Sequence, residues 1–225
     1  MPIFALALSL PLLAASAGAA EPAPARLLSS LGAVTIESAG QKRSGKAGAV
    51  LSSGDAVSTG AGATALLELG DSSKLKLGES SRIVLTLPGP GSRHTQAQLS
   101  FGSLFAKIAK RLPGAEFRVR TESSVAAVRG TEFFTAFGRK TRGRKDLWLC
   151  VKEGAVEVST DASGKGVLVP EGKGILIEGE RDISEPREFD WTKKLNWNMD
   201  PESGSLEDKT DLGAAYADLL DQDYR

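Results

Sequence analysis

Residues 67–85 read Leu67-Glu68-Leu69-Gly70-Asp71-Ser72-Ser73-Lys74, then Leu75-Lys76-Leu77-Gly78-Glu79-Ser80-Ser81-Arg82, then Ile83-Val84-Leu85. The same eight-residue unit occurs twice and begins a third time. Each unit opens with apolar residues two positions apart, the spacing of side chains on one face of a β-strand. The following glycine, acid and serines are typical of turns, because glycine adopts positive φ and Asp and Ser bond to nearby backbone groups. Each unit therefore predicts one short strand and one tight turn.

The same pattern of short apolar runs bounded by glycine extends over residues 31–178. It includes residues 33–37, residues 117–120 and a pair of short strands around Gly102, and it shows no convincing helix. We therefore expect an all-β domain of many short strands, built as a β-solenoid or roll or as a sandwich. The eight-residue period favours stacked rungs locally, but a meander of small hairpins gives the same spacing.

The first residues differ from the rest of the chain. Residues 3–15 are apolar and too few to span a bilayer as a helix, and residues 17–20 are small. We predict a signal peptide over residues 1–20, cleaved after Ala19 or Ala20, followed by a linker over residues 21–30. No cysteine follows the apolar stretch, so a lipoprotein is not expected. The mature chain has no second run long enough to cross a membrane, which predicts a periplasmic or secreted protein.

The chain has one cysteine, Cys150, so no internal disulfide can form. It lies in the apolar run of residues 147–151, which predicts a small buried side chain. The other interpretation is an intermolecular disulfide or a reactive thiol.

Charge is distributed unevenly, although the net charge of the chain is zero. Residues 101–152 hold twelve basic and four acidic side chains, and residues 178–225 hold fourteen acidic and six basic ones. The densest basic stretch is predicted to be a hairpin loop, and its candidate binding residues are Arg139, Lys140, Arg142, Arg144 and Lys145. They fit an acidic protein, an anionic polymer or a lipid headgroup, but a solvated loop that protects a strand edge has the same composition. Nucleic acid is not expected in this compartment.

The acidic tail, residues 179–225, is predicted to be weakly helical or disordered. Residues 206–220 fit a weak amphipathic helix through Leu212, Tyr216, Leu219 and Leu220. Residues 190–197 fit an aromatic clip that docks on the domain. The tail could also fold back on the basic stretch.

Enzymatic chemistry finds little support in the residue types. The single histidine, His94, follows a Pro-Gly loop, and one histidine and one cysteine do not make a metal site. Asp71 and Glu79 occupy equivalent turns, where turn chemistry explains them. We expect no enzyme, no cofactor and no metal.

Three segments resemble the FecR domain: Val-Leu-Ser-Ser-Gly-Asp-Ala-Val-Ser-Thr-Gly at residues 50–60, Arg-Thr-Glu-Ser-Ser-Val-Ala-Ala-Val-Arg-Gly-Thr-Glu-Phe at residues 120–133, and Val-Lys-Glu-Gly-Ala-Val-Glu-Val at residues 151–158. The resemblance covers about residues 32–177 and implies a periplasmic or extracellular all-β module without catalytic residues. Named members of the family pass a receptor signal through a membrane helix to a sigma-factor regulator. This chain shows neither that helix nor a cytoplasmic helical region, which implies a stand-alone secreted FecR-domain protein.

The shared motif residues are expected to serve the fold. They are Gly54, Asp55, Arg129, Gly130 and Thr131. The glycines suit turns or close backbone approaches, and Asp55 suits bonds to turn amides. The Arg129 guanidinium is expected to be held by Glu132 or by a backbone carbonyl.

Three functions fit the sequence. The preferred one is a non-enzymatic module of the cell envelope that binds another protein in signalling, for example by adding a strand to an exposed edge. The second is a binder of cell-wall glycan or an anionic envelope polymer through residues 139–145. The third is a self-associating structural protein, in which the acidic tail of one copy meets the basic stretch of the next.

Overall fold

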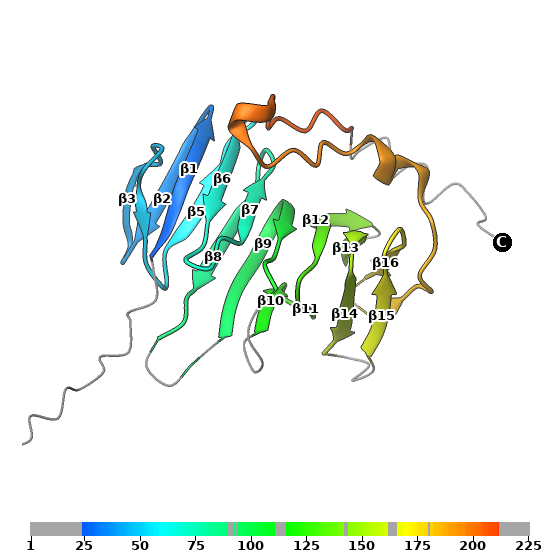
Figure 1. Ribbon diagram of the computed structural model, residues 1–225. Coiled ribbons are helices and arrows are strands. Elements are labelled where there is room, and N and C mark those ends of the chain that lie inside the picture. Colours follow the sequence, from blue (N-terminus) through cyan, green and yellow to red (C-terminus); the bar gives the residue numbers. More distant parts are fainter. Residues whose placement is uncertain are drawn as a thin grey trace, which may run out of the picture.

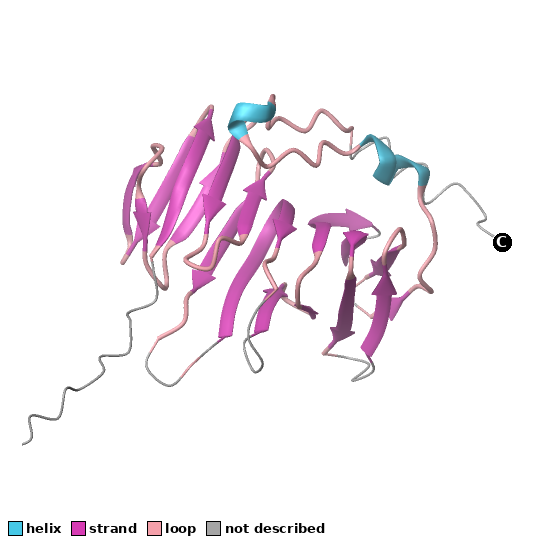
Figure 2. Cartoon of the chain, viewed as in Figure 1, coloured by secondary structure: helices cyan, strands magenta, loops and turns pink. Residues whose placement is uncertain are grey.

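The computed structural model describes residues 24–89, 92, 94–110, 116–141, 144–161, 166–179 and 181–211. Strands dominate this part of the chain (Figures 1 and 2), and all 17 belong to one hydrogen-bonded network that folds into two layers. The predicted all-β class is confirmed. The predicted signal peptide, residues 1–20, lies outside the described residues.

One layer, sheet A, contains in spatial order β4 (Val50–Leu51), β1 (Ala25–Leu31), β6 (Thr64–Glu68), β7 (Lys74–Leu77), β9 (His94–Lys107), β12 (Glu132–Thr141), β13 (Arg144–Glu153), β16 (Gly174–Glu178) and β17 (Asp182–Ile183). The other layer, sheet B, contains β3 (Gln41–Ser44), β2 (Val34–Ser38), β5 (Ala56–Thr59), β8 (Arg82–Thr86), β9 again, β10 (Glu116–Arg120), β11 (Ser124–Val128), β14 (Ala155–Thr160) and β15 (Gly166–Pro170). Every pairing is antiparallel except that of β9 with β10.

The repeat at residues 67–85 forms the strands it predicts. Leu67, Leu75 and Ile83 are all fully buried on the inner faces of the layers. The first turn closes a hairpin between β6 and β7 inside sheet A, and the second carries the chain from β7 across to β8 in sheet B. The unit therefore makes one hairpin and one crossover, so it does not stack as solenoid rungs.

Strand β9 joins the layers. Residues 94–101 pair in sheet B and residues 102–107 pair in sheet A, with Gly102 at φ +92° where the strand changes sheets. A Cβ on Gly102 would overlap Cα, Cβ and Oγ of Ser81. The two short strands expected around Gly102 are thus one bent strand, and only glycine fits at the bend.

Two hydrophobic cores follow from this arrangement. The larger lies between the layers and takes inward-facing residues of both, such as Leu27, Ile36, Leu104 and Phe117. The smaller lies on the outer face of sheet A, beneath the C-terminal segment. Sheet A therefore buries both of its faces.

The linker expected over residues 21–30 is shorter, because Ala25–Leu31 forms β1 with Ala25 and Leu27 fully buried. The tail is weakly helical, as predicted, since it forms two 3-10 helices, η1 (Asp190–Lys194) and η2 (Pro201–Ser203). The helix predicted over residues 206–220 is not present over residues 206–211. The remaining positions of the expected helix lie outside the described residues. In the described part of the chain, no helix is long and apolar enough to cross a membrane.

The bend in β9 gives a test of the fold. Gly54 has φ +93° with open space around it, whereas Gly102 has φ +92° against Ser81. We expect Gly54→Ala to lower the free energy of unfolding by about 1–2 kcal/mol through backbone strain. Gly102→Ala should cost about 1–3 kcal/mol more through the steric overlap. Urea denaturation measures both, and equal losses would contradict the close approach.

Candidate functional site: a strapped face and an uncharged edge

The outer face of sheet A carries a row of buried side chains. Registers place Leu66 opposite Lys76, Lys76 opposite Phe105, Phe105 opposite Phe134 and Phe134 opposite Cys150. With Ala136 and Trp148 beside them, we call these seven residues the outer row, and each is at most 5% exposed. They are outward residues of strands whose other side chains fill the inner core.

The C-terminal segment passes over sheet A (Figure 1). We call residues 188–211 the strap. Its Phe189, Leu195 and Met199 are buried against the outer row, and the Trp197 ring meets the Phe105 ring edge-on with centroids 5.5 Å apart. The expected aromatic clip over residues 190–197 is thus partly realised, through Trp197.

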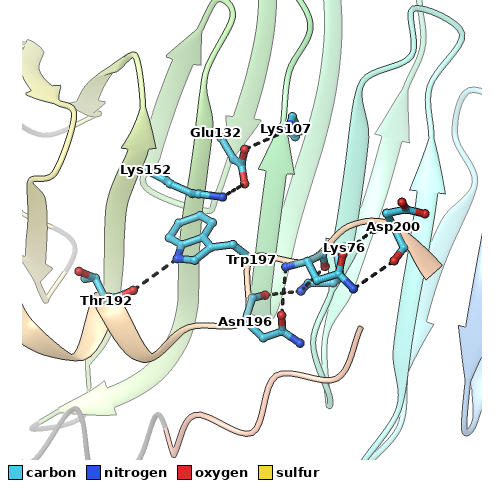
Figure 3. Close-up of polar contacts among 9 residues, drawn as sticks. Lys76, Lys107, Glu132, Lys152, Thr192, Asn196, Trp197 and Asp200 are labelled. Carbon is cyan, nitrogen blue, oxygen red and sulfur yellow. Dashed lines mark hydrogen bonds and ion pairs between the residues drawn. The ribbon is translucent and has the colours of Figure 1, made fainter. Parts of the chain in front are cut away.

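Two lysines, Lys76 and Lys74, donate hydrogen bonds to the strap backbone, and Figure 3 draws those of Lys76. Lys76 Nζ donates to the carbonyl oxygens of Asn196 and, at 2.9 Å, Asn198, and it lies 4.2 Å from the centre of the Phe105 ring. Lys74 Nζ donates to the carbonyl of Met199 at 3.2 Å. Burial lowers the pKa of Lys76 to about 8, although Asp208 and Glu132 oppose this shift. The only charged member of the outer row is therefore a lysine hydrogen-bonded to main-chain carbonyls.

A buried carboxylate lies next to the strap. The Glu132 side chain is 4% exposed, with its oxygens 3.3 Å from Lys107 Nζ and 2.8 Å from Lys152 Nζ. Lys152 Nζ in turn lies 5.4 Å from the centre of the Trp197 ring. Besides Lys74 and Lys76, the strap therefore contacts Lys152, which belongs to the basic residues 101–152. The acidic tail does fold back on the domain.

The strap also has internal bonds that fix its shape. The Asn196 side-chain Nδ2 donates to the carbonyls of Ser205 and Glu207, both at 2.8 Å. The Asn198 side-chain Nδ2 donates to the carbonyls of Asp200 and Gly204, both at 3.0 Å. The strap is therefore a compact loop that lies on the sheet without adding a strand to it.

Sequence reasoning did not find the outer row. The signal was present, because residues 65–67, 133–134, 136–137 and 147–151 are apolar at successive positions and not at alternate ones. Such runs indicate strands that are buried on both faces.

The motif residues Gly54 and Asp55 lie where one strand turns, and Gly130 and Thr131 lie where another does. Gly54 has positive φ, and the Asp55 carboxylate accepts from the Ser52 amide at 3.0 Å. Gly130 also has positive φ, and Thr131 is buried after it. The expected bond from Glu132 to Arg129 is wrong, because Arg129 is exposed and Glu132 contacts the two lysines named above.

The five candidate binding residues belong to the hairpin between β12 and β13. Arg139 pairs in register with Asp146, and Lys140 with Lys145, so strand pairing extends further into the predicted loop than expected. Lys145 is partly buried, with Nζ 2.5 Å from the Glu122 carboxylate. Arg144 begins β13, and Arg142 lies outside the described residues.

The residues weighed for chemistry occupy ordinary positions. His94 begins β9 with its side chain 54% exposed. The Asp71 carboxylate accepts a hydrogen bond from the Ser73 backbone amide at 3.1 Å. The Glu79 carboxylate accepts one from the Gly62 backbone amide at 2.7 Å, so the two carboxylates bind different turns. Cys150 is buried as predicted, and burial raises the pKa of its thiol. Within the described residues, no three His, Cys, Asp or Glu side chains form a metal-binding group.

The four outer edges of the two sheets differ in their protection. Strands β4 and β17 have two residues each, and β3 is exposed and carries Lys42 and Arg43. Short strands and charges are the usual protection against unwanted pairing. In contrast, β15 is five residues long and uncharged, exposes 63% of Leu168, and pairs with β14 alone among the described strands. Its one protective feature is Pro170 at its end, which lacks a backbone N–H.

Lys76 makes the stability of the domain depend on pH. Its folded pKa of about 8 lies below the ordinary 10.5, so the folded state binds fewer protons than the unfolded state between these values. Relative to Lys76→Met, we expect the wild-type free energy of unfolding to rise with pH by about 1 kcal/mol per unit across this window. Urea denaturation of both proteins at several pH values measures this difference. Cys150 contributes the same pH dependence to both proteins, so its contribution cancels. A difference that is constant with pH would contradict the buried ammonium.

Residues 55–164 match the model of the FecR protein family. Two crystal structures of a "putative anti-sigma factor" from Parabacteroides distasonis are similar in fold. The 1.65 Å structure has a TM-score of 0.53 and 16% identity over 62% of this chain and 63% of that one. The 2.50 Å structure has a TM-score of 0.52 and 17% identity over 62% of each chain.

This chain therefore matches less than two thirds of either solved protein. Comparison with curated proteins gave no significant match. The sequence motifs, the all-β structure and the family match agree, and residues 55–164 of this chain form a FecR domain.

Proposed function

We propose that this chain is a non-enzymatic regulatory module of the cell envelope, periplasmic or secreted, which acts in signalling by binding another protein. The FecR domain supports a regulatory role, since this family is regulatory and not catalytic. The similar solved proteins carry an anti-sigma factor description, which points the same way. The signal peptide predicted from residues 1–20 supports the location.

The observation that carries protein binding is the open edge of β15. An edge strand presents unpaired N–H and C=O groups to any extended chain that approaches it. Leu168 is 63% exposed at its centre, and no side chain of the strand bears a charge that would repel a partner. An extended segment of an envelope protein can therefore add to sheet B beside β15, with Leu168 as the apolar contact.

Affinity capture from envelope extract tests this function. The bait is the mature chain, residues 21–225, beside Leu168→Lys. A charge at the centre of β15 should weaken capture of the specific partner at least about tenfold, a loss of about 1.4 kcal/mol. Binding of the purified partner then gives the affinity ratio.

Two control variants separate the alternatives. Leu31→Lys places the same charge on another exposed apolar residue, one that is 51% exposed and lies on β1, at the opposite end of the molecule from β15 (Figure 1). It should leave capture unchanged. Replacing Arg139, Lys140, Arg142, Arg144 and Lys145 with Ser should also leave it unchanged. Capture of glycan or anionic polymer that only this variant abolishes would replace our proposal with the polymer-binding function.

A further inference from the structure

The strap occupies sheet A in the way a bound peptide would. No residue of the strap belongs to a strand of the sheet, so its hold on the outer row comes from side chains and from three carbonyl oxygens. Leu195, Trp197 and Met199 alternate along the chain and pack against the row. This spacing of two residues places large side chains on one face of an extended segment.

Charge on the two surfaces is complementary. The described strap carries seven acidic and three basic side chains. The face beneath and around it carries Lys74, Lys76, Lys107 and Lys152, with two acids, Glu132 beside Lys107 and Lys152 and Glu68 opposite Lys74. An acidic segment is therefore attracted to this face before its apolar side chains are buried.

The covered state has a built-in cost. Lys76 is 1% exposed, and its two strap hydrogen bonds go to neutral carbonyls of Asn196 and Asn198. Burying an ammonium in this way costs free energy that is recovered when the strap lifts and water returns. An uncovered outer row would in turn expose Phe105 and Phe134, so another segment of the same chemistry would be favoured in the place of the strap.

We propose that the outer row of sheet A is a docking surface for an extended acidic segment of another protein, with large apolar residues at alternate positions, and that the strap is its exchangeable occupant in this chain. Lys74 and Lys76 contact backbone carbonyls, which every peptide offers. Selectivity comes from the apolar spacing and from the acidic charge. This docking surface lies on sheet A, whereas the proposed β15 site lies on sheet B, so each site can fail without the other.

Binding of a peptide to the full mature chain tests the proposed docking surface. The probe is a fluorescein-labelled synthetic peptide of residues 188–211, followed by fluorescence anisotropy. Trp197→Ala in the protein weakens its own strap, so the probe should bind this variant at least about tenfold more tightly than wild type. The same probe carrying Trp197→Ala should bind at least about tenfold more weakly, and added salt should weaken binding of both probes.

A second probe tests the chemical class of the partner. An unrelated acidic peptide with three large apolar residues at alternate positions should compete with the labelled strap peptide. A peptide with the same composition but adjacent apolar residues should not. Equal competition by both would overturn the proposed recognition of spacing.

Hydrogen exchange distinguishes an exchangeable strap from a permanent part of the core. Amides of residues 188–211 should exchange by local opening, faster than those of β9. Two results together would overturn the proposal. The amides of residues 188–211 and of β9 would exchange only through global unfolding, and the probe would not bind to a folded Trp197→Ala variant. Dimers formed by mutual exchange of straps, with no binding of the probe or the unrelated acidic peptide, would make a second copy the occupant and overturn it as well.

Discussion

The structure depends on the close approach of Ser81 to Gly102. The Ser81 hydroxyl accepts from the Ser103 amide at 2.8 Å, and its own amide donates to Thr59 Oγ1 at 2.9 Å. These buried bonds fix the crossover after β7 against the bend of β9. Since β9 is the strand shared by both layers, its bend sets the separation that the inner core must fill. The same bend places Phe105 on the outer face of sheet A, so the strapped face also follows from this contact.

The two sheets meet water differently, and the reason lies in their outward residues. Sheet B presents polar side chains and surface ion pairs, such as Arg82 with Glu37 at 3.2 Å and Arg118 with Glu116 at 2.6 Å. Such pairs contribute little to stability but keep the face solvated. Sheet A presents the outer row, which has no comparable contact with water. An apolar face of this kind needs a cover, and the strap supplies it with residues about 120 positions away in sequence from Lys76.

Local patterns in the sequence predicted what local forces determine. The apolar spacing at residues 67–85 identified three strands and their inner faces, and the apolar run around Cys150 identified a buried thiol. The same patterns could not tell a hairpin from a crossover, because a Gly-acid-Ser-Ser turn reverses the chain without specifying the next partner strand. The strap was predicted only in outline, as an aromatic clip over residues 190–197 and as a tail that could fold back. Apart from the alternation of Leu195, Trp197 and Met199, residues 188–211 show neither the strand period of two nor the helical period of 3.6. Their order comes from contacts with strands far away in sequence.

Lys76 gives the strapped face a defined register in exchange for stability. An outer row made only of apolar residues would accept a sliding strap, since apolar contact has no direction. The ammonium requires carbonyl oxygens above it, and those of Asn196 and Asn198 lie two residues apart on the side that also directs Trp197 to Phe105. A shift by one residue would turn Trp197 away from the row and leave the ammonium without these bonds. A buried charge costs stability but discriminates between registers, so that a segment selected by its apolar spacing and acidic charge is held in one position on the face.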